Sequence, residues 1–204
     1  MSTQTQSLFS LVNYGVKGSG LVAKKNIDAG TLLISEPPIL RVALMDGDLS
    51  PAVGTDLSRQ FSVMNKDKRR VVIRLANNYE EEDEVLGIYK TNAMIISPSQ
   101  SALFPWVCRA NHSCVPNCNY IFNHQLEEQQ MYASRLIRKG EELTVSYLPD
   151  NLIGGVQQRR SYLQKTHNFT CMCDYCNREV VALKQDEYFR EIAVRRIGKM
   201  LKKM

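Results

Sequence analysis

NHSCVPNC, residues 111–118, places an Asn-His pair, two cysteines and a proline within eight positions. It does not stand alone, because GEELTVSY follows at residues 140–147 and CMCDYC at residues 171–176. A polar Asn-His-Ser-Cys segment, a strand ending in tyrosine and a C-x-C-x2-C cluster, in this order, indicate one kind of chemistry. The order of the three segments therefore carries more information than any one of them.

The size and charge of the chain exclude several classes of protein. It has 204 residues, room for one domain with at most an appended element. A net charge of +5 is far from a dense Lys/Arg surface, which disfavours direct nucleic-acid binding. No secretory signal is visible, and no run of about eighteen apolar residues suggests a membrane span. We therefore expect the nucleus and/or the cytoplasm, where the six cysteines stay reduced and thiolates bind metal.

Apolar patterning predicts β-rich parts on either side of a helical insert. In the insert, at about residues 45–90, Leu57, Phe61 and Met64 recur at roughly helical spacing. The acidic run at residues 80–84 is interpreted as a solvated loop or helix start. Strands are predicted at residues 8–12, 31–35, 118–122, 129–136 and 143–148, a helix at 157–164, and an amphipathic C-terminal helix within 181–204 that packs on the core.

The cysteine triplet predicts a metal site. Cys171, Cys173 and Cys176 lie within six residues, and C-x-C cysteines rarely bridge each other. Three thiolates in one tight turn suit a tetrahedral zinc ion, which needs a fourth ligand. Buried free thiols are the alternative, and we favour it for two of the remaining cysteines, Cys108 and Cys118. The spacing leaves the fourth ligand open among Cys108, Cys114, Cys118, His112, His124 and His167.

Together these segments resemble the SET-domain protein-lysine methyltransferases, and within them the SET-and-MYND (split-SET) branch and its fungal relatives that lack the MYND finger. The resemblance rests on the glycine turn KGSG at residues 17–20, the segment at 109–118, the strand at 140–147 and the cysteines at 171–176. It implies a β-rich α+β fold, a β-clip with a pseudoknot, a helical insert and a zinc-binding post-SET turn. The implied domains are a SET domain at 1–150, a post-SET zinc-binding segment at 151–180 and the C-terminal helix at 181–204.

The resemblance also implies a cofactor and a metal. S-adenosylmethionine would be the methyl donor, with Phe169 on its adenine ring and the glycine turn on its methionine end. A tight turn, a loop-capping Asn92 and a small-core Phe169 are the structural alternatives. Cys114 becomes the fourth ligand, so that one zinc ion binds Cys114, Cys171, Cys173 and Cys176. The implied cofactor contacts are Lys17, Gly18, Gly20, Asn92, Asn111, His112, Tyr147 and Phe169.

Tyr147 is the implied catalytic residue of a protein-lysine N-methyltransferase. The attacking lysine has a free pKa of about 10.4, which a narrow apolar channel and the sulfonium charge of the donor would lower. A tyrosine hydroxyl at the bottom of that channel can orient the amine, so positioning does much of the work. The partner would be a histone tail or another lysine-containing protein, and the resemblance does not say which.

Two departures from the branch are visible. No cysteine occurs between Arg41 and Asn92, so no MYND finger is present there. Where the branch has a second tyrosine before the post-SET cysteines, this chain has His167 nearby, which would either replace it in the lysine channel or face solvent. A catalytically silent SET module that binds a peptide or serves as a scaffold is the alternative function, and loss of cofactor binding would distinguish it.

Overall fold

The computed structural model describes residues 7–15, 18–79, 83–149 and 155–177. Lys17, the first three residues of the acidic run (80–82) and the C-terminal helix expected at 181–204 lie outside these residues. Within the described part of the chain, the strands form three small sheets, and no helix there is long and apolar enough to cross a membrane.

The first sheet joins the two signature segments that lie about thirty residues apart in the sequence. Its strand order is β1-β2-β11-β8, antiparallel except for the last pair. β11 and β8 run parallel, with Thr144 opposite Asn111 and Val145 opposite His112. The strands are β1 (Phe9–Asn13), β2 (Ser19–Ala23), β11 (Glu142–Val145) and β8 (Asn111–His112).

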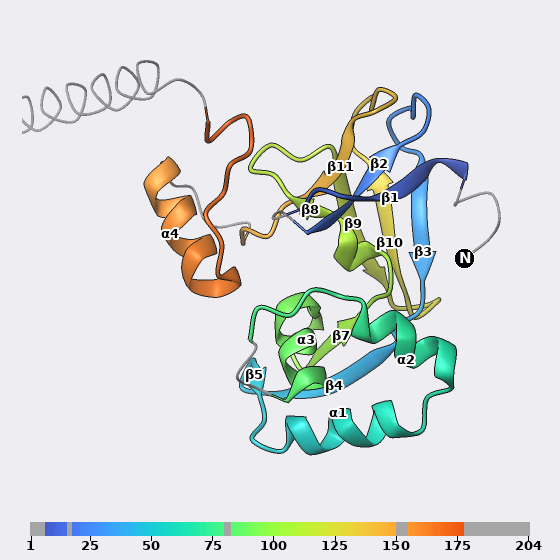
Figure 1. The fold of residues 1–204 in the computed structure, drawn as a ribbon, viewed down its shortest axis with the longest axis vertical. Coiled ribbons are helices and arrows are strands. Elements are labelled where there is room, and N and C mark those ends of the chain that lie inside the picture. Colours follow the sequence, from blue (N-terminus) through green and yellow to red (C-terminus); the bar gives the residue numbers. More distant parts are fainter. Residues whose placement is uncertain (1–6, 16–17, 80–82, 150–154, 178–204) are drawn as a thin grey trace, which may run out of the picture.

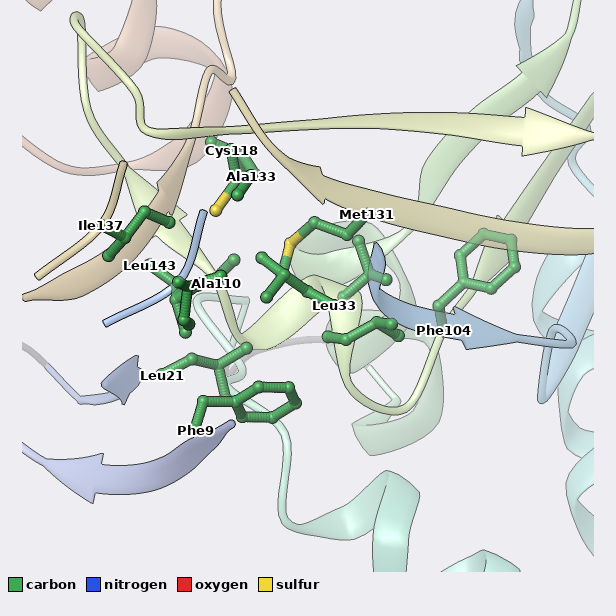
Figure 2. Packing of buried hydrophobic residues seen from close by; sticks show 14 of the residues in the cluster. Phe9, Leu21, Leu33, Phe104, Ala110, Cys118, Met131, Ala133, Ile137 and Leu143 are labelled. Carbon is green, nitrogen blue, oxygen red and sulfur yellow. The ribbon is translucent and has the colours of Figure 1, made fainter. Parts of the chain in front are cut away.

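The second sheet is an antiparallel triplet that carries the larger core. It has the order β3-β10-β9, formed by β3 (Leu32–Glu36), β10 (Glu128–Ala133) and β9 (Cys118–Asn123). Along β10, burial alternates, so Met131 and Ala133 point inward. Figure 2 shows Met131 beside Leu33 in the middle of the cluster, and Cys118 beside Ala133 at the top of the view. Each large side chain buried here contributes about 1.5–3 kcal/mol.

The third sheet and three helices form the insert, which lies at one end of the molecule in Figure 1. Leu57, Val72, Ile88 and Leu103 pack there in a second core cluster. The helical pattern predicted for the insert forms two successive helices, separated at Asn65. The side chain of Asn65 caps the second of these helices by accepting a hydrogen bond from Lys68 N. The elements are β4 (Leu40–Met45), β5 (Asp48–Leu49), α1 (Val53–Ser62), α2 (Lys66–Ile73), α3 (Glu84–Asn92), β6 (Met94–Ser97) and β7 (Gln100–Leu103), in the sheet order β5-β4-β7-β6.

Helix α4 (Val156–His167) stands beside the β-rich part and leads into the cysteine turn (Figure 1). It ends at Asn168, which adopts the left-handed conformation at φ 57°. Leu163 of α4, Cys171 and Cys176 form a third, small buried cluster. The cysteine turn is thus attached through three buried residues and the partly buried side chains that pack against them.

The three sheets with few helices confirm the expected β-rich α+β class. The parallel pairing of β8 with β11 puts the signature segments side by side, as a pseudoknot requires, and the threading itself stays a prediction, as do the domain boundaries. One strand and one sheet differ from expectation. The strand predicted to reach residue 148 ends at Val145, because Tyr147 N donates to a side chain instead of a neighbouring strand. The sheet of β4 to β7 was not predicted at all.

Candidate active site and metal centre

One large cavity brings most of the predicted site residues together. Its volume is about 1550 Å³, and it lies between the insert, the first sheet and the segment after α4. Gly18, at φ +75°, lines it in a conformation that glycine adopts without strain. Gly20 does not line the cavity itself but packs against residues that do. The predicted residues that line the cavity are Gly18, Asn92, Asn111, His112, Tyr147, Phe169, Cys171 and Cys173.

Gly20 supports the cavity floor by leaving room for two polar side chains. A Cβ at this position would lie 2.5 Å from Glu142 Oε1 and 2.6 Å from Asn111 Nδ2. Those two atoms are joined by a 2.7 Å hydrogen bond, in which the amide donates to the carboxylate. Asn111 Nδ2 is also 3.3 Å from the carbonyl oxygen of Ser19. The glycine turn and the Asn-His segment are therefore fitted to each other through Glu142.

The side chain of Asn117 links the segment at residues 111–118 to β11. Its buried amide donates to the carbonyl of Glu142 at 2.8 Å and accepts from Thr144 N at 2.8 Å. A side chain thereby replaces backbone partners that these strand groups would otherwise lack. Asn117 and Glu142 were not predicted as site residues, although both lie inside the quoted motifs.

Tyr147 is held at both its backbone and its hydroxyl. Its hydroxyl donates to the carbonyl oxygen of Ala110 at 2.8 Å, and its backbone N–H donates to His112 Nδ1 at 3.0 Å. Burial, with the nearby Cys108, Tyr120 and Glu142 adding to it, raises the pKa of Tyr147 well above its usual range. The phenol is therefore neutral at physiological pH, a donor with a fixed position and a poor base.

Three rings surround the tyrosine. The ring centroids of Tyr147 and His167 are 5.0 Å apart, those of Tyr147 and His112 5.4 Å, and those of Tyr147 and Phe169 6.3 Å. His167 lines the cavity beside Tyr147, which favours a place in the lysine channel over the alternative of facing solvent. Burial lowers the pKa of His167, which keeps this wall uncharged near neutral pH.

Asn92 makes contacts that suit its structural alternative. At the end of α3 its Nδ2 donates to the carbonyls of Ala76 at 2.7 Å and Ile88 at 2.8 Å. Both amide hydrogens are thereby used by the protein backbone. Asn92 lines the cavity, but its amide nitrogen is hydrogen-bonded to backbone carbonyls of the insert.

The cysteines form a compact sulfur cluster. The sulfur atoms of Cys114, Cys171, Cys173 and Cys176 all lie within 4.8 Å of one another. Cys114 Sγ is 3.8 Å from Cys171 Sγ and 3.5 Å from Cys176 Sγ. A tetrahedral zinc ion with Zn–S distances of about 2.3 Å requires sulfur separations of about 3.8 Å. The cluster has the ligand type, number and spacing of a structural zinc site.

The other thiols lie outside this cluster. Cys118 is buried in the main core, and Cys108 packs against the insert and lines the large cavity. Burial raises the pKa of both thiols to about 12, so they remain protonated. Within the described residues, the structure groups neither of them with a possible metal ion.

Two arginines of α4 support the cysteine turn and were not anticipated. Arg160 donates from Nε to the carbonyl of Cys171 and from Nη2 to that of Cys176, both at 3.1 Å. Arg159 is 8% exposed; its burial lowers the pKa of the guanidinium, but the nearby thiols of Cys114 and Cys176 outweigh burial and raise that pKa. In the sequence, QQRRS has the composition of a solvated helix face, so local pattern gives no signal for either contact.

The fold and this site define a SET domain. Residues 18–148, more than half of the chain, match the sequence model of the SET domain, and the chain therefore belongs to that family. The suspected family is thereby confirmed.

Known relatives agree with the suspected branch. The chain is 26% identical over 180 residues to the histone-lysine N-methyltransferase set5 of Schizosaccharomyces pombe, covering 88% of this chain and 53% of that protein. It is 40% identical over 108 residues to the histone-lysine N-methyltransferase SET5 of Candida glabrata, covering 53% and 19%. To the histone-lysine N-methyltransferase SMYD1 of Homo sapiens it is 28% identical over 113 residues, covering 47% and 23%. The chain thus spans about half the length of the first relative and less of the other two.

Proposed function

We propose that this protein is an S-adenosylmethionine-dependent protein-lysine N-methyltransferase. The observation that carries the proposal is the convergence of Asn111, His112, Tyr147 and Phe169 on one cavity of about 1550 Å³. Membership of the SET domain family and similarity to histone-lysine N-methyltransferases support the same activity. The substrate is a lysine of a histone or of another protein.

The cavity residues fit a nucleoside-bearing methyl donor. Phe169 offers a ring face for a base, and Gly18 leaves backbone groups open to close approach. Asn111 and His112 lie between these two points on β8. When bound, S-adenosylmethionine would supply a methyl group made electrophilic by its sulfonium.

Tyr147 orients the acceptor in this reaction. In the proposed reaction a neutral lysine amine would receive the methyl group from the sulfonium sulfur, and the methylated nitrogen would release one proton to solvent. The raised pKa of Tyr147 makes proton removal by its phenolate unfavourable near pH 7, so the hydroxyl acts by position. The rings of Tyr147, His167 and Phe169 form an uncharged wall that disfavours a charged ammonium.

We further propose one structural zinc ion bound by Cys114, Cys171, Cys173 and Cys176. Its role is to join the turn after α4 to the Asn-His-Ser-Cys segment, because the apolar cluster at that junction is small. Action on histones or cytosolic proteins accords with the expected nuclear and/or cytoplasmic location.

The decisive experiment is transfer of a radiolabelled methyl group from S-adenosylmethionine to histones and to a cell lysate. Mass spectrometry of labelled bands should find methylated lysine. Cofactor binding is measured separately by the shift in melting temperature. The absence of both shift and transfer would point to the silent SET module and contradict the proposed cofactor site, and a shift without any transfer would contradict the proposed activity while keeping the cofactor site.

A further inference from the structure

Both ring nitrogens of His112 make a polar contact, one with Tyr147 and the other with Cys114. Nδ1 accepts the backbone N–H of Tyr147 at 3.0 Å, and Nε2 lies 3.3 Å from Cys114 Sγ. A single imidazole therefore touches the backbone of the proposed catalytic residue and a sulfur of the proposed metal site.

The first contact fixes the tautomer of the imidazole. A backbone N–H can only donate, so Nδ1 must present its lone pair to Tyr147. A neutral imidazole that accepts at Nδ1 carries its proton at Nε2. That proton then points to Cys114 Sγ, and the contact is an N–H donated to sulfur. Such a bond suits a metal-bound thiolate, since the sulfur bears negative charge.

A positive charge also lies near the same sulfur. The guanidinium of Arg159 interacts electrostatically with the thiols of Cys114 and Cys176, and its carbon lies 4.7 Å from the centroid of the Tyr175 ring. Four thiolates around one Zn²⁺ leave a net charge of about −2, which is costly where water is excluded unless donors or positive charges surround it. His112 on β8 provides a donor, and Arg159 on α4 provides a positive charge.

We propose that His112 is a positioning residue that couples the zinc centre to Tyr147. This rests on the zinc site and the methyltransferase activity proposed above. Metal binding would fix the position of the Cys114 sulfur, which accepts the Nε2–H of His112. The imidazole ring held in this way presents Nδ1 as the acceptor for the backbone N–H of Tyr147. Zinc thereby sets the placement of the tyrosine hydroxyl without touching the substrate.

Two substitutions separate the two bonds. In His112→Asn the amide oxygen can occupy the place of Nδ1 and accept from Tyr147, but nothing reaches Cys114. In His112→Gln the longer amide can place an N–H near the position of Nε2 and keep the sulfur contact, while the acceptor for Tyr147 is lost. Both variants remove the imidazole, so each is the control for the other.

The measurements are zinc affinity by competition with a chromogenic chelator and the sulfur-to-metal charge-transfer band of the Co²⁺-loaded full chain. We expect His112→Asn to lose about 10-fold or more in zinc affinity and to shift the cobalt band. We expect His112→Gln to stay within about 3-fold of the parent in affinity, to keep the band, and to lower kcat for methyl transfer. Circular dichroism verifies that both are folded.

Equal metal affinities and unchanged cobalt bands in both variants would overturn the coupling, and so would equal losses in both. A parent chain that binds neither zinc nor cobalt would remove the zinc centre and the coupling with it. A parent that binds metal but methylates no protein would contradict the proposed activity. The zinc affinities of the two variants would then still test the contact with Cys114.

Discussion

Tyr147 contributes through the place of its hydroxyl, so a phenylalanine there tests the proposed role most directly. Tyr147→Phe keeps the ring among His112, His167 and Phe169 but removes the bond to Ala110 O. We expect kcat to fall about 100-fold or more, in the range of lost positioned donors. The unpaired carbonyl should cost about 1–3 kcal/mol of unfolding free energy. Cofactor affinity, measured by calorimetry, should change little, and transfer at the parent rate would contradict the role.

Glu36 is a buried carboxyl that the motifs did not reveal. It is 4% exposed, and its Oε1 accepts the backbone N–H groups of Trp106 and Val107, at the start of the turn that leads to the Asn-His segment. Burial raises its pKa to about 7, although the two N–H groups and Arg109 oppose that shift. The folded state therefore keeps its proton in a range where the unfolded chain has lost it.

This difference predicts how stability depends on pH. Because the folded pKa of Glu36 lies above the unfolded value, stability should fall as pH rises from about 4.5 to about 7, by about 3 kcal/mol at most. Glu36→Gln keeps an acceptor for both N–H groups and cannot ionise, so that part of the loss should vanish. Urea unfolding at pH 5, 6 and 7 measures it, and parallel stability curves for parent and variant would contradict the burial effect.

At the scale of elements, the fit of β2 against β8 and β11 depends on the absence of a side chain at Gly20. Gly20→Ala would force apart Asn111 and Glu142, whose atoms lie within 2.6 Å of the added carbon. We expect a loss of about 1–3 kcal/mol of stability and weaker cofactor binding. Thermal melts with and without S-adenosylmethionine measure both effects.

Gly54 is the matched control for that substitution. A Cβ there meets only Leu86 Cδ2, at 3.7 Å, and the residue lies inside α1. Gly54→Ala should therefore leave cofactor binding unchanged and raise stability by up to about 1 kcal/mol, because alanine is the better helix former. If both substitutions reduced cofactor binding equally, the close packing at Gly20 would not be the cause.

Local pattern was sufficient for some elements and not for others. β3, β9 and β10 were predictable because β-forming residues recur there and turns separate them. β6 and β7, with the sequences MIIS and QSAL, are too short to show a period, and only the pairing of β6 with β7 and of β7 with β4 makes them a sheet. The motif order predicted the four cysteines that the fold brings together. It could not predict Glu36, Arg159 or the second bond of His112, because each depends on contacts between distant segments.

At the scale of the whole molecule, the described residues form two large core clusters and one small one, and this difference in size predicts the effect of metal removal. The main core and the insert core each bury many large apolar residues, whereas the cluster at α4 buries only Leu163 with Cys171 and Cys176. Chelation should therefore release α4 and the cysteine turn while the sheets persist. In hydrogen exchange, we expect amides of residues 156–177 to exchange at least about 10-fold faster after chelation, and those of β3 and β10 to stay protected.

Two cysteine variants distinguish the effect of losing the metal from any other effect of the chelator. Cys173→Ser removes one of the four sulfurs and should reproduce the effect of chelation, with no rescue by added zinc. Cys108→Ser lies outside the cluster and should behave as the parent does, including recovery of protection when zinc is returned. Loss of protection throughout the sheets would mean that the metal stabilises the entire fold. Unchanged exchange in residues 156–177 would mean that Arg160 and the small cluster hold the turn without it.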